Sequence, residues 1–259
     1  MSERLDADLL RAALPSGPWE LVLVAETGST NADVRAAALD GRAGPGYVVV
    51  AEHQTAGRGR LDRTWVAAPG EALTFSALVR PELVPAERWG WLPLLAGLAV
   101  VDAVRGLRLK WPNDVWDASG GKVAGILVER VDAPSGPMAV IGIGLNVTGA
   151  PDLPGASSLA RAGGDDLHRP TVLALVLGAL AARFEAWHSA RGDADAAGLA
   201  ADYRAACATL GAEVRVDLPG DQVLTGRGEE IAADGSLVLA TAGGPQRVAA
   251  GDVSHVRTI

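Results

Sequence analysis

The chain has 259 residues, of which 49% are hydrophobic and 21% charged, as expected for a soluble globular protein. Its formal net charge of −8 provides no polybasic surface, so neither DNA nor a membrane is an expected partner. The charged start, residues 1–15, does not resemble a secretory signal, and the apolar runs 92–101 and 172–182 are too short to span a bilayer. The single Cys207 excludes an internal disulfide and a multi-cysteine zinc site, which indicates a cytoplasmic location.

Hydrophobic periodicity predicts a mixture of strands and helices over most of the chain. Patterns with a period of 3.6 predict helices at residues 3–14, 30–40, 86–104, 170–190 and 193–208. Runs rich in β-branched residues predict strands at 21–25, 47–52, 73–79, 108–110, 123–131 and 138–147. Thr30 is the expected N-cap of the second helix, and Gly41 follows its end. Because strands and helices do not alternate strictly, we expect an α+β fold with a mixed sheet.

The pattern changes around Leu210. Short alternating apolar stretches follow, separated by turn signals such as Pro219-Gly220 and Asp234-Gly235. This arrangement predicts a small all-β domain over residues 210–259, after a larger domain over residues 1–209.

Three arginines lie close together in the segment 57–63, namely Arg58, Arg60 and Arg63. The segment has no hydrophobic period and is therefore expected to be a loop. Its glycines let the backbone approach a ligand, and arginine suits bidentate contacts with phosphate. We interpret the segment as a phosphate-binding loop; the alternative is a solvated, charged surface loop.

Two further polar segments follow. Pro112 ends a strand, so Asn113 and Asp114 emerge at its tip, where they could equally form an ordinary turn. Lys122 follows two glycines but does not belong to a Walker A loop, because Val123 replaces Ser/Thr. It is either a surface lysine at a hairpin or a lysine that projects inward over a ligand.

The segment 142–146 contains two glycines, but Val147 replaces the third glycine of a dinucleotide fingerprint. The glycines would instead let another group lie flat on a strand, and Asn146 offers amide hydrogen bonds. Ser29 and Thr30 are suited to N-capping, which would occupy one hydroxyl and leave the other free. The four histidines lack ligand spacing, so no His/Cys metal site is expected.

Together these segments resemble the biotin protein ligase family, in the family's order over residues 20–150. The matching motifs are Glu26-Thr-Gly-Ser-Thr-Asn31, Glu52-His-Gln54, Gly57-Arg-Gly-Arg60 with Trp65, Lys110-Trp-Pro-Asn-Asp114, Gly121-Lys-Val-Ala-Gly-Ile-Leu-Val-Glu129 and Gly142-Ile-Gly-Leu-Asn146. The resemblance implies a catalytic domain of the biotin/lipoate ligase type over 1–209 and a small SH3-like β domain over 210–259. The 25 residues before Glu26 are too few for the DNA-binding domain that some members carry, so we expect the form without it.

The resemblance also implies the reaction. Such an enzyme adenylates biotin with ATP to biotinyl-5′-AMP, with Mg²⁺ carried by the ATP phosphates, and transfers biotin to a lysine of a biotin carboxyl carrier protein domain. A homodimer is compatible with the resemblance. The alternatives are a lipoate or octanoate ligase of the same fold, and a non-enzymatic sensor of biotin or nucleotide.

Individual roles follow from the same resemblance. Biotin contacts are implied for Ser29, Thr30, Asn31, Gln54, Gly57, Arg58, Arg60, Lys122, Gly125 and Gly142. ATP contacts are implied for Arg58, Arg60, Arg63, Trp65, Lys110, Asn113, Lys122 and Asn146. Catalytic roles are implied for Lys122, Arg58, Arg60 and Asp114, the last to orient the carrier lysine or accept its proton. Leu61 and Asp62 depart from the family's loop, from which we expect altered loop ordering rather than lost activity.

Overall fold

The computed structural model describes residues 4–14, 17–61, 63–164, 168–218, 222–249 and 251–255. Within them, the larger part of the chain is built on a seven-stranded sheet in the order β1-β2-β3-β7-β6-β5-β4. The strands are β1 (Glu20–Thr27), β2 (Tyr47–Gln54), β3 (Ala72–Val79), β4 (Arg108–Lys110), β5 (Asp114–Trp116), β6 (Lys122–Ala133) and β7 (Gly136–Asn146). β1 and β2 run parallel and the other neighbours antiparallel, so the prediction of an α+β fold with a mixed sheet is confirmed.

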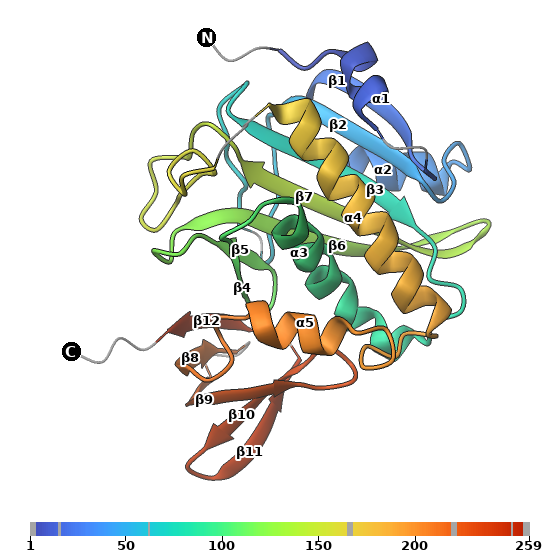
Figure 1. Ribbon diagram of the computed structural model, residues 1–259. Helices are drawn as coiled ribbons and strands as arrows, with labels where there is room; N and C mark the ends of the chain where they lie inside the picture. The colour runs from blue at the N-terminus through green and yellow to red at the C-terminus, as the bar shows by residue number, and fades with distance from the viewer. Residues whose placement is uncertain are drawn as a thin grey trace.

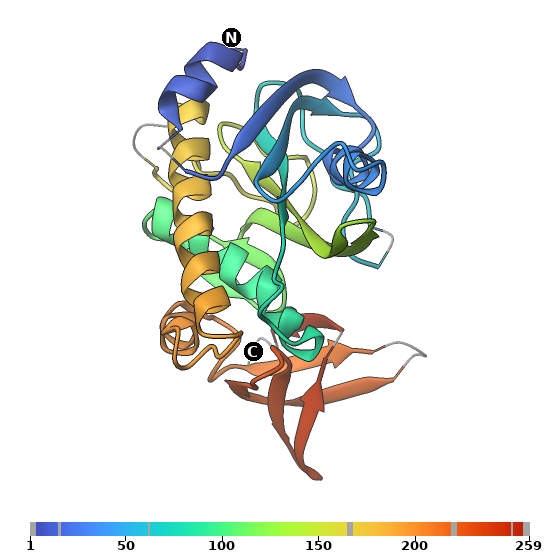
Figure 2. The ribbon, with the colours of Figure 1, turned by 90° about the vertical axis from the view of Figure 1, so that its right-hand side faces the viewer.

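Helices cover both faces of this sheet. α3 (Leu92–Ala103) and α4 (Arg169–Ser189) lie across one face, and α2 (Thr30–Leu39) lies on the other (Figures 1 and 2). Each face has its own apolar core, with Phe75 beneath α3 and α4 and Leu78 beneath α2. β3 is consequently buried at every position, which explains its mostly apolar sequence; its two polar residues, Thr74 and Ser76, are buried and hydrogen-bonded.

Three predicted helices begin or divide elsewhere, and one of them, predicted at 193–208, is the shorter α5 (Leu199–Ala206). The helix predicted at 3–14 is shorter, α1 (Ala7–Ala13), because the Asp6 carboxylate accepts two first-turn backbone N–H groups and caps it. The helix predicted at 86–104 is a 3₁₀ helix, η1 (Ala86–Trp91), followed by α3, which has Pro93 in its first turn. Proline fits there because a first-turn N–H needs no intrahelical partner.

The whole of helix α4 is long and apolar enough to cross a membrane by length and composition. The apolar run 172–182 within it is too short to do so. Its apolar side chains are buried in the core beside the sheet and α3, among them Leu173, Val176 and Leu180. A buried core helix passes the same test, and the packing of α4 is that of a core helix.

A second, all-β unit follows α5 (Leu199–Ala206). In the part of the chain that the structure describes, it is a five-stranded antiparallel sheet in the order β11-β10-β9-β8-β12. Its strands are β8 (Glu213–Asp217), β9 (Val223–Ile231), β10 (Leu237–Thr241), β11 (Gly244–Val248) and β12 (Asp252–His255). The unit lies beside α5 and the β4–β5 hairpin (Figure 1). The domain division that we propose, at residues 209 and 210, falls between α5 and β8.

Two buried tryptophans join the β domain to the rest. Trp111 Nε1 donates to the Gly235 carbonyl over 3.0 Å, and Trp91 Nε1 donates to the Ala232 carbonyl over 3.1 Å. The backbones also meet directly, since a Cβ on Gly90 would lie 2.2 Å from the carbonyl oxygen of Asp234. The two parts therefore share a close-packed junction next to the β4–β5 turn.

Candidate functional site

A cavity opens between the arginine–glycine loop (residues 57–61 and 63–65) and the strands β6 and β7. It contains about 890 Å³ of empty space, part of it open to solvent. Its lining includes most of the residues singled out in the sequence: Ser29, Thr30, Asn31, Gln54, Arg58, Arg60, Arg63, Trp65, Lys110, Asn113, Asp114, Lys122, Gly125 and Gly142. Gly57 and Asn146 lie outside the lining.

A chain of polar side chains forms one wall of the cavity. Gln54 Oε1 accepts hydrogen bonds from the Thr30 backbone N–H over 2.8 Å and from its hydroxyl over 3.0 Å. Ser76 Oγ lies 2.7 Å from the Thr30 hydroxyl and donates to Asn31 Oδ1 over 2.6 Å. Asn31 Nδ2 donates in turn to Glu129 Oε2 over 2.7 Å. These bonds fix the amide and hydroxyl groups at the start of α2 against the sheet.

The expected N-cap of α2 was wrong by one residue. Ser29 is the N-cap, and Thr30 is the first helical residue. Ser29 makes no capping hydrogen bond through its side chain, whereas the Thr30 hydroxyl is engaged by Gln54. Within the described residues the Ser29 hydroxyl therefore stays available to a ligand in the cavity that it lines.

The glycines of β7 make room for two side chains, as the sequence predicted. A Cβ on Gly144 would lie 2.3 Å from the Trp65 ring, and one on Gly142 would lie 2.0 Å from Asn31 Oδ1. The Trp65 indole thus lies against β7 and lines the cavity.

Asn146 occupies a different place from the one expected. Its Nδ2 donates to the Ser157 carbonyl over 2.9 Å, and its Oδ1 is buried without a partner in the described part of the chain. The side chain is 2% exposed and holds the segment after β7 rather than lining the cavity. A direct contact with ATP therefore requires the segment to move.

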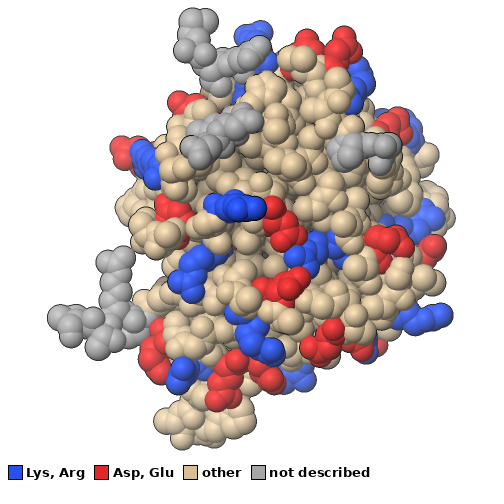
Figure 3. Space-filling view, in the orientation of Figure 1, with Lys and Arg blue, Asp and Glu red and all other residues tan. Residues whose placement is uncertain are grey.

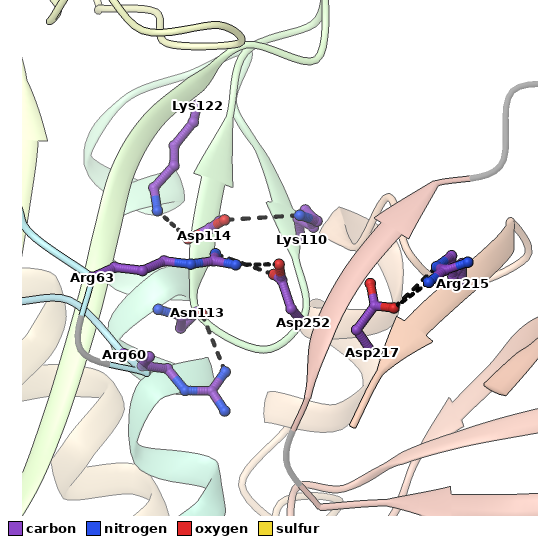
Figure 4. A network of polar contacts seen from close by, with 9 residues as sticks. All are labelled: Arg60, Arg63, Lys110, Asn113, Asp114, Lys122, Arg215, Asp217 and Asp252. Atoms are coloured by element: carbon purple, nitrogen blue, oxygen red, sulfur yellow. Dashed lines mark hydrogen bonds and ion pairs between the residues drawn. The ribbon is translucent and has the colours of Figure 1, made fainter. Parts of the chain in front are cut away.

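Two lysines share one carboxylate at the cavity edge. Lys122 Nζ lies 2.6 Å from Asp114 Oδ1, and Lys110 Nζ lies 3.9 Å from Asp114 Oδ2 (Figure 4). Asp114 is held there because it pairs with Lys110 across the β4–β5 hairpin and with Gly125 on β6. Burial lowers the pKa of Lys110, and the Asp114 charge opposes that effect. The Lys122 side chain thus lines the cavity while it remains 38% exposed.

Each arginine of the loop meets a different polar partner. Arg58 Nη2 donates to Glu129 Oε1 over 3.1 Å, and Arg63 pairs with Asp252. Arg60 Nη1 lies 3.4 Å from Asn113 Oδ1 (Figure 4), and burial lowers the pKa of its guanidinium. The loop thus presents three cations to the cavity.

The loop itself is a narrow hairpin. Arg58 and Thr64 form an isolated antiparallel bridge, and the Gly59 N–H donates to the Arg63 carbonyl over 2.6 Å. Leu61 lies at the tip with φ of +54°, in the left-handed region that leucine seldom adopts. Asp62 lies outside the described residues. The effect of both substitutions on loop ordering stays a prediction.

No group of three or more His, Cys, Asp or Glu side chains among the described residues is arranged to hold a metal ion.

Comparison with known proteins identifies the family. Residues 34–146 match the model of the biotin/lipoate A/B protein ligase family, and residues 209–256 match that of the biotin protein ligase C-terminal domain. A biotin--[acetyl-CoA-carboxylase] ligase of Mycobacterium tuberculosis is 46% identical over 252 residues, which cover 93% of this chain and 91% of the relative. The chain belongs to the biotin protein ligase family.

Other biotin protein ligases agree in sequence and in fold. A biotin--[acetyl-CoA-carboxylase] ligase of Paracoccus denitrificans is 35% identical over 89% of this chain and 98% of its own length. The solved structure of a biotin protein ligase from Aquifex aeolicus in complex with biotin and ATP has a TM-score of 0.75 and 27% identity, covering 92% of this chain and 99% of that one.

Sequence reasoning assigned no role to three polar residues at or next to the cavity of this biotin protein ligase family member. Ser76 and Glu129 do not line the cavity but hydrogen-bond to Asn31, which does, and Asp252 reaches the cavity from β12. Ser76 and Glu129 are polar residues inside apolar strands, a signal that could have drawn attention to them. Asp252 has no such signal, because its neighbours in sequence belong to the other domain.

Proposed function

We propose that this protein is a biotin ligase that adenylates biotin with ATP to biotinyl-5′-AMP and transfers biotin to a lysine of a biotin carboxyl carrier protein domain. The observation that carries the proposal is one cavity with a polar wall and a cluster of five cations, Arg58, Arg60, Arg63, Lys110 and Lys122. This cavity lies in a chain that is similar over 93% of its length to a biotin--[acetyl-CoA-carboxylase] ligase.

The cations address the main barrier of the first step. An oxygen of the biotin carboxylate attacks the α-phosphorus of ATP, and the bond to pyrophosphate breaks. Two like charges about 4 Å apart repel by about 4 kcal/mol at an effective dielectric near 20. Lys122 lines the cavity, and we propose that it meets both the biotin carboxylate and the α-phosphate and stabilises the developing charge.

The polar wall suits the ureido ring of biotin. Ser29 offers a free hydroxyl, and the Thr30 and Gln54 side chains are fixed by their mutual hydrogen bonds. Fixed donors and acceptors discriminate well, because a ligand without matching groups would leave them unpaired. We propose that the Trp65 indole, which also lines the cavity, packs against the nucleotide.

Asp114 acts through Lys122 in this scheme. Its carboxylate is 2.6 Å from Lys122 Nζ and also faces Lys110. We therefore assign it the role of orienting Lys122, in preference to accepting the proton of the carrier lysine.

Mg²⁺ would arrive on the ATP phosphates and neutralise part of their charge when bound. Among the described residues, the two carboxylates that line the cavity, Asp114 and Asp252, are each paired with cations, so the donor set fits a metal held mainly by phosphate. We also propose a cytoplasmic enzyme that does not bind operator DNA. Figure 3 shows Lys and Arg interspersed with Asp and Glu on one face, without a continuous basic patch.

The test is exchange of labelled pyrophosphate into ATP, with biotin and with lipoate compared side by side. We expect exchange that depends on biotin. Equal exchange with lipoate would favour a lipoate ligase, and no exchange with biotin would favour a non-enzymatic sensor.

A substitution of Lys122 ties the activity to this cavity. Lys122→Ala should lower the exchange rate by about tenfold to a hundredfold, because a hydrogen bond to a charged group contributes about 1.5–3 kcal/mol. Arg130→Ala is the control, since Arg130 lies on the same strand outside the cavity lining, where it pairs with the exposed Asp132 and lies over the Trp89 ring. A Lys122 variant that keeps full exchange would contradict the assigned role.

A further inference from the structure

The C-terminal β domain contributes one charged side chain to the cavity. Asp252, the first residue of β12, lines the cavity together with Gly251. Arg63 Nη1 donates to Asp252 Oδ1 over 3.3 Å, and Arg63 Nη2 pairs with Asp252 Oδ2 (Figure 4). This ion pair joins the arginine–glycine loop to a strand 189 residues further along the chain.

Asp252 is an anion surrounded by positive charge. Burial by itself would raise its pKa, but the hydrogen bond from Arg63 and the nearby lysine charges hold the pKa below its ordinary value. The hydrogen bond to Asp252 raises the pKa of Arg63 in turn. The β domain thus places a permanent negative charge among cations that suit ATP phosphates.

The ion pair is not what holds the two domains together. The junction rests on the buried hydrogen bonds of Trp91 and Trp111 and on the backbone contact at Gly90. By contrast, the side chains of Arg63 and Asp252 are 61% and 34% exposed. Ion pairs of such exposure contribute little to stability, so an incoming anion can exchange with one partner.

We propose that Asp252 is a positioning residue: a resident counter-ion that holds Arg63 at the cavity and gives it up to an ATP phosphate. The inference rests on the proposed function, because it assigns Arg63 to the nucleotide. Asp252 competes with ATP for Arg63 and keeps that side chain oriented toward the cavity. The β domain thereby sets the affinity for ATP from outside the catalytic domain.

The test is Asp252→Asn, which removes the charge and keeps the size of the side chain. In the biotin-dependent exchange assay, KM for ATP should fall by about threefold to tenfold. KM for biotin should stay the same, and kcat should change less than KM for ATP. Asp217→Asn is the matched control, because Asp217 pairs with Arg215 at 2.7 Å in the same domain and does not line the cavity (Figure 4).

Two further variants separate this role from a structural one. Asp252→Glu keeps the charge and should keep KM for ATP within about twofold of wild type. In an Arg63→Ala background, Asp252→Asn should no longer change KM for ATP, because the guanidinium for which Asp252 and ATP compete is absent.

An unchanged or raised KM for ATP in Asp252→Asn would overturn the inference, as would an undiminished effect in the Arg63→Ala background. Absence of biotin-dependent exchange in wild type would instead refute the proposed function. The melting temperature of each variant should be measured to show that the variant is folded in the assay.

Discussion

Arg60 is held at the cavity more by its place in the loop than by strong pairing. Its contact with Asn113 is 3.4 Å long, and burial lowers the pKa of its guanidinium. An acyl phosphate would give it an anionic partner, with charge-assisted hydrogen bonds of about 1.5–3 kcal/mol each. Arg60 is therefore suited to retaining biotinyl-AMP once it has formed.

Replacement of Arg60 by glycine should separate retention from synthesis. Adenylation should survive in part because Lys122 remains, while the intermediate should escape about tenfold faster or more, since 1.4 kcal/mol is a factor of ten. Incubation with ATP, biotin and an unrelated lysine-rich protein, followed by a biotin blot, should show labelled bystander lysines. The control variant Arg42→Gly, at an exposed arginine paired with Asp40, should not increase this labelling. Labelling no higher than wild type, despite measurable adenylation, would mean that Arg60 does not retain the intermediate.

At the scale of elements, the flat contact between Trp65 and β7 shapes the cavity. The indole lies on the strand at Gly144, where a Cβ would come within 2.3 Å of the ring. Its Nε1 is buried without a partner among the described residues. The packing against glycine, rather than a hydrogen bond, therefore fixes the ring.

Gly144→Ala should displace that ring. The added methyl group forces the indole off the strand, and overpacking of this kind costs about 1–3 kcal/mol. If Trp65 packs against the nucleotide, KM for ATP should rise by about tenfold in the exchange assay. Gly44→Ala is the control, because a Cβ there meets nothing within 4 Å. An unchanged KM for ATP in Gly144→Ala would contradict a contact between Trp65 and the nucleotide.

At the scale of the whole molecule, the junction between the domains contains a titratable group. The His255 ring lies 5.0 Å from the Trp116 ring. Burial lowers the pKa of His255 from its ordinary value near 6.5, and the charges of Lys110 and Arg108 lower it further. The unfolded chain thus takes up a proton at a higher pH than the folded one, so this contribution to stability is present above pH 6.5 and is lost as the pH falls toward the folded pKa.

Acidification should consequently weaken the junction through His255. Between pH 7.5 and pH 5.5 the melting temperature should fall by about 1–2 °C more in wild type than in His255→Gln. His168→Gln, on the far side of the junction at the start of α4, should behave as wild type. An equal fall of the melting temperature with pH in wild type and His255→Gln would show that His255 does not titrate in this range.

The sequence by itself determined the parts of this protein that depend on local pattern. Periodicity and turn residues predicted the mixed sheet and the separate all-β domain, because the same side chains that favour a strand or helix also repeat with its period. The arginine–glycine loop and the role of the glycines of β7 could also be predicted from the sequence. Glycine allows another group to approach the backbone closely, and clustered arginines indicate an anion-binding site.

Only the tertiary structure decided which groups meet. It showed that Ser29 rather than Thr30 keeps a free hydroxyl, and that Asp114 is engaged by Lys122. It also brought Asp252 to Arg63, although no local pattern links the two. Such contacts form because the packing of separate cores fixes the strands and the β domain relative to one another, and packing between distant segments leaves no periodic trace in the sequence.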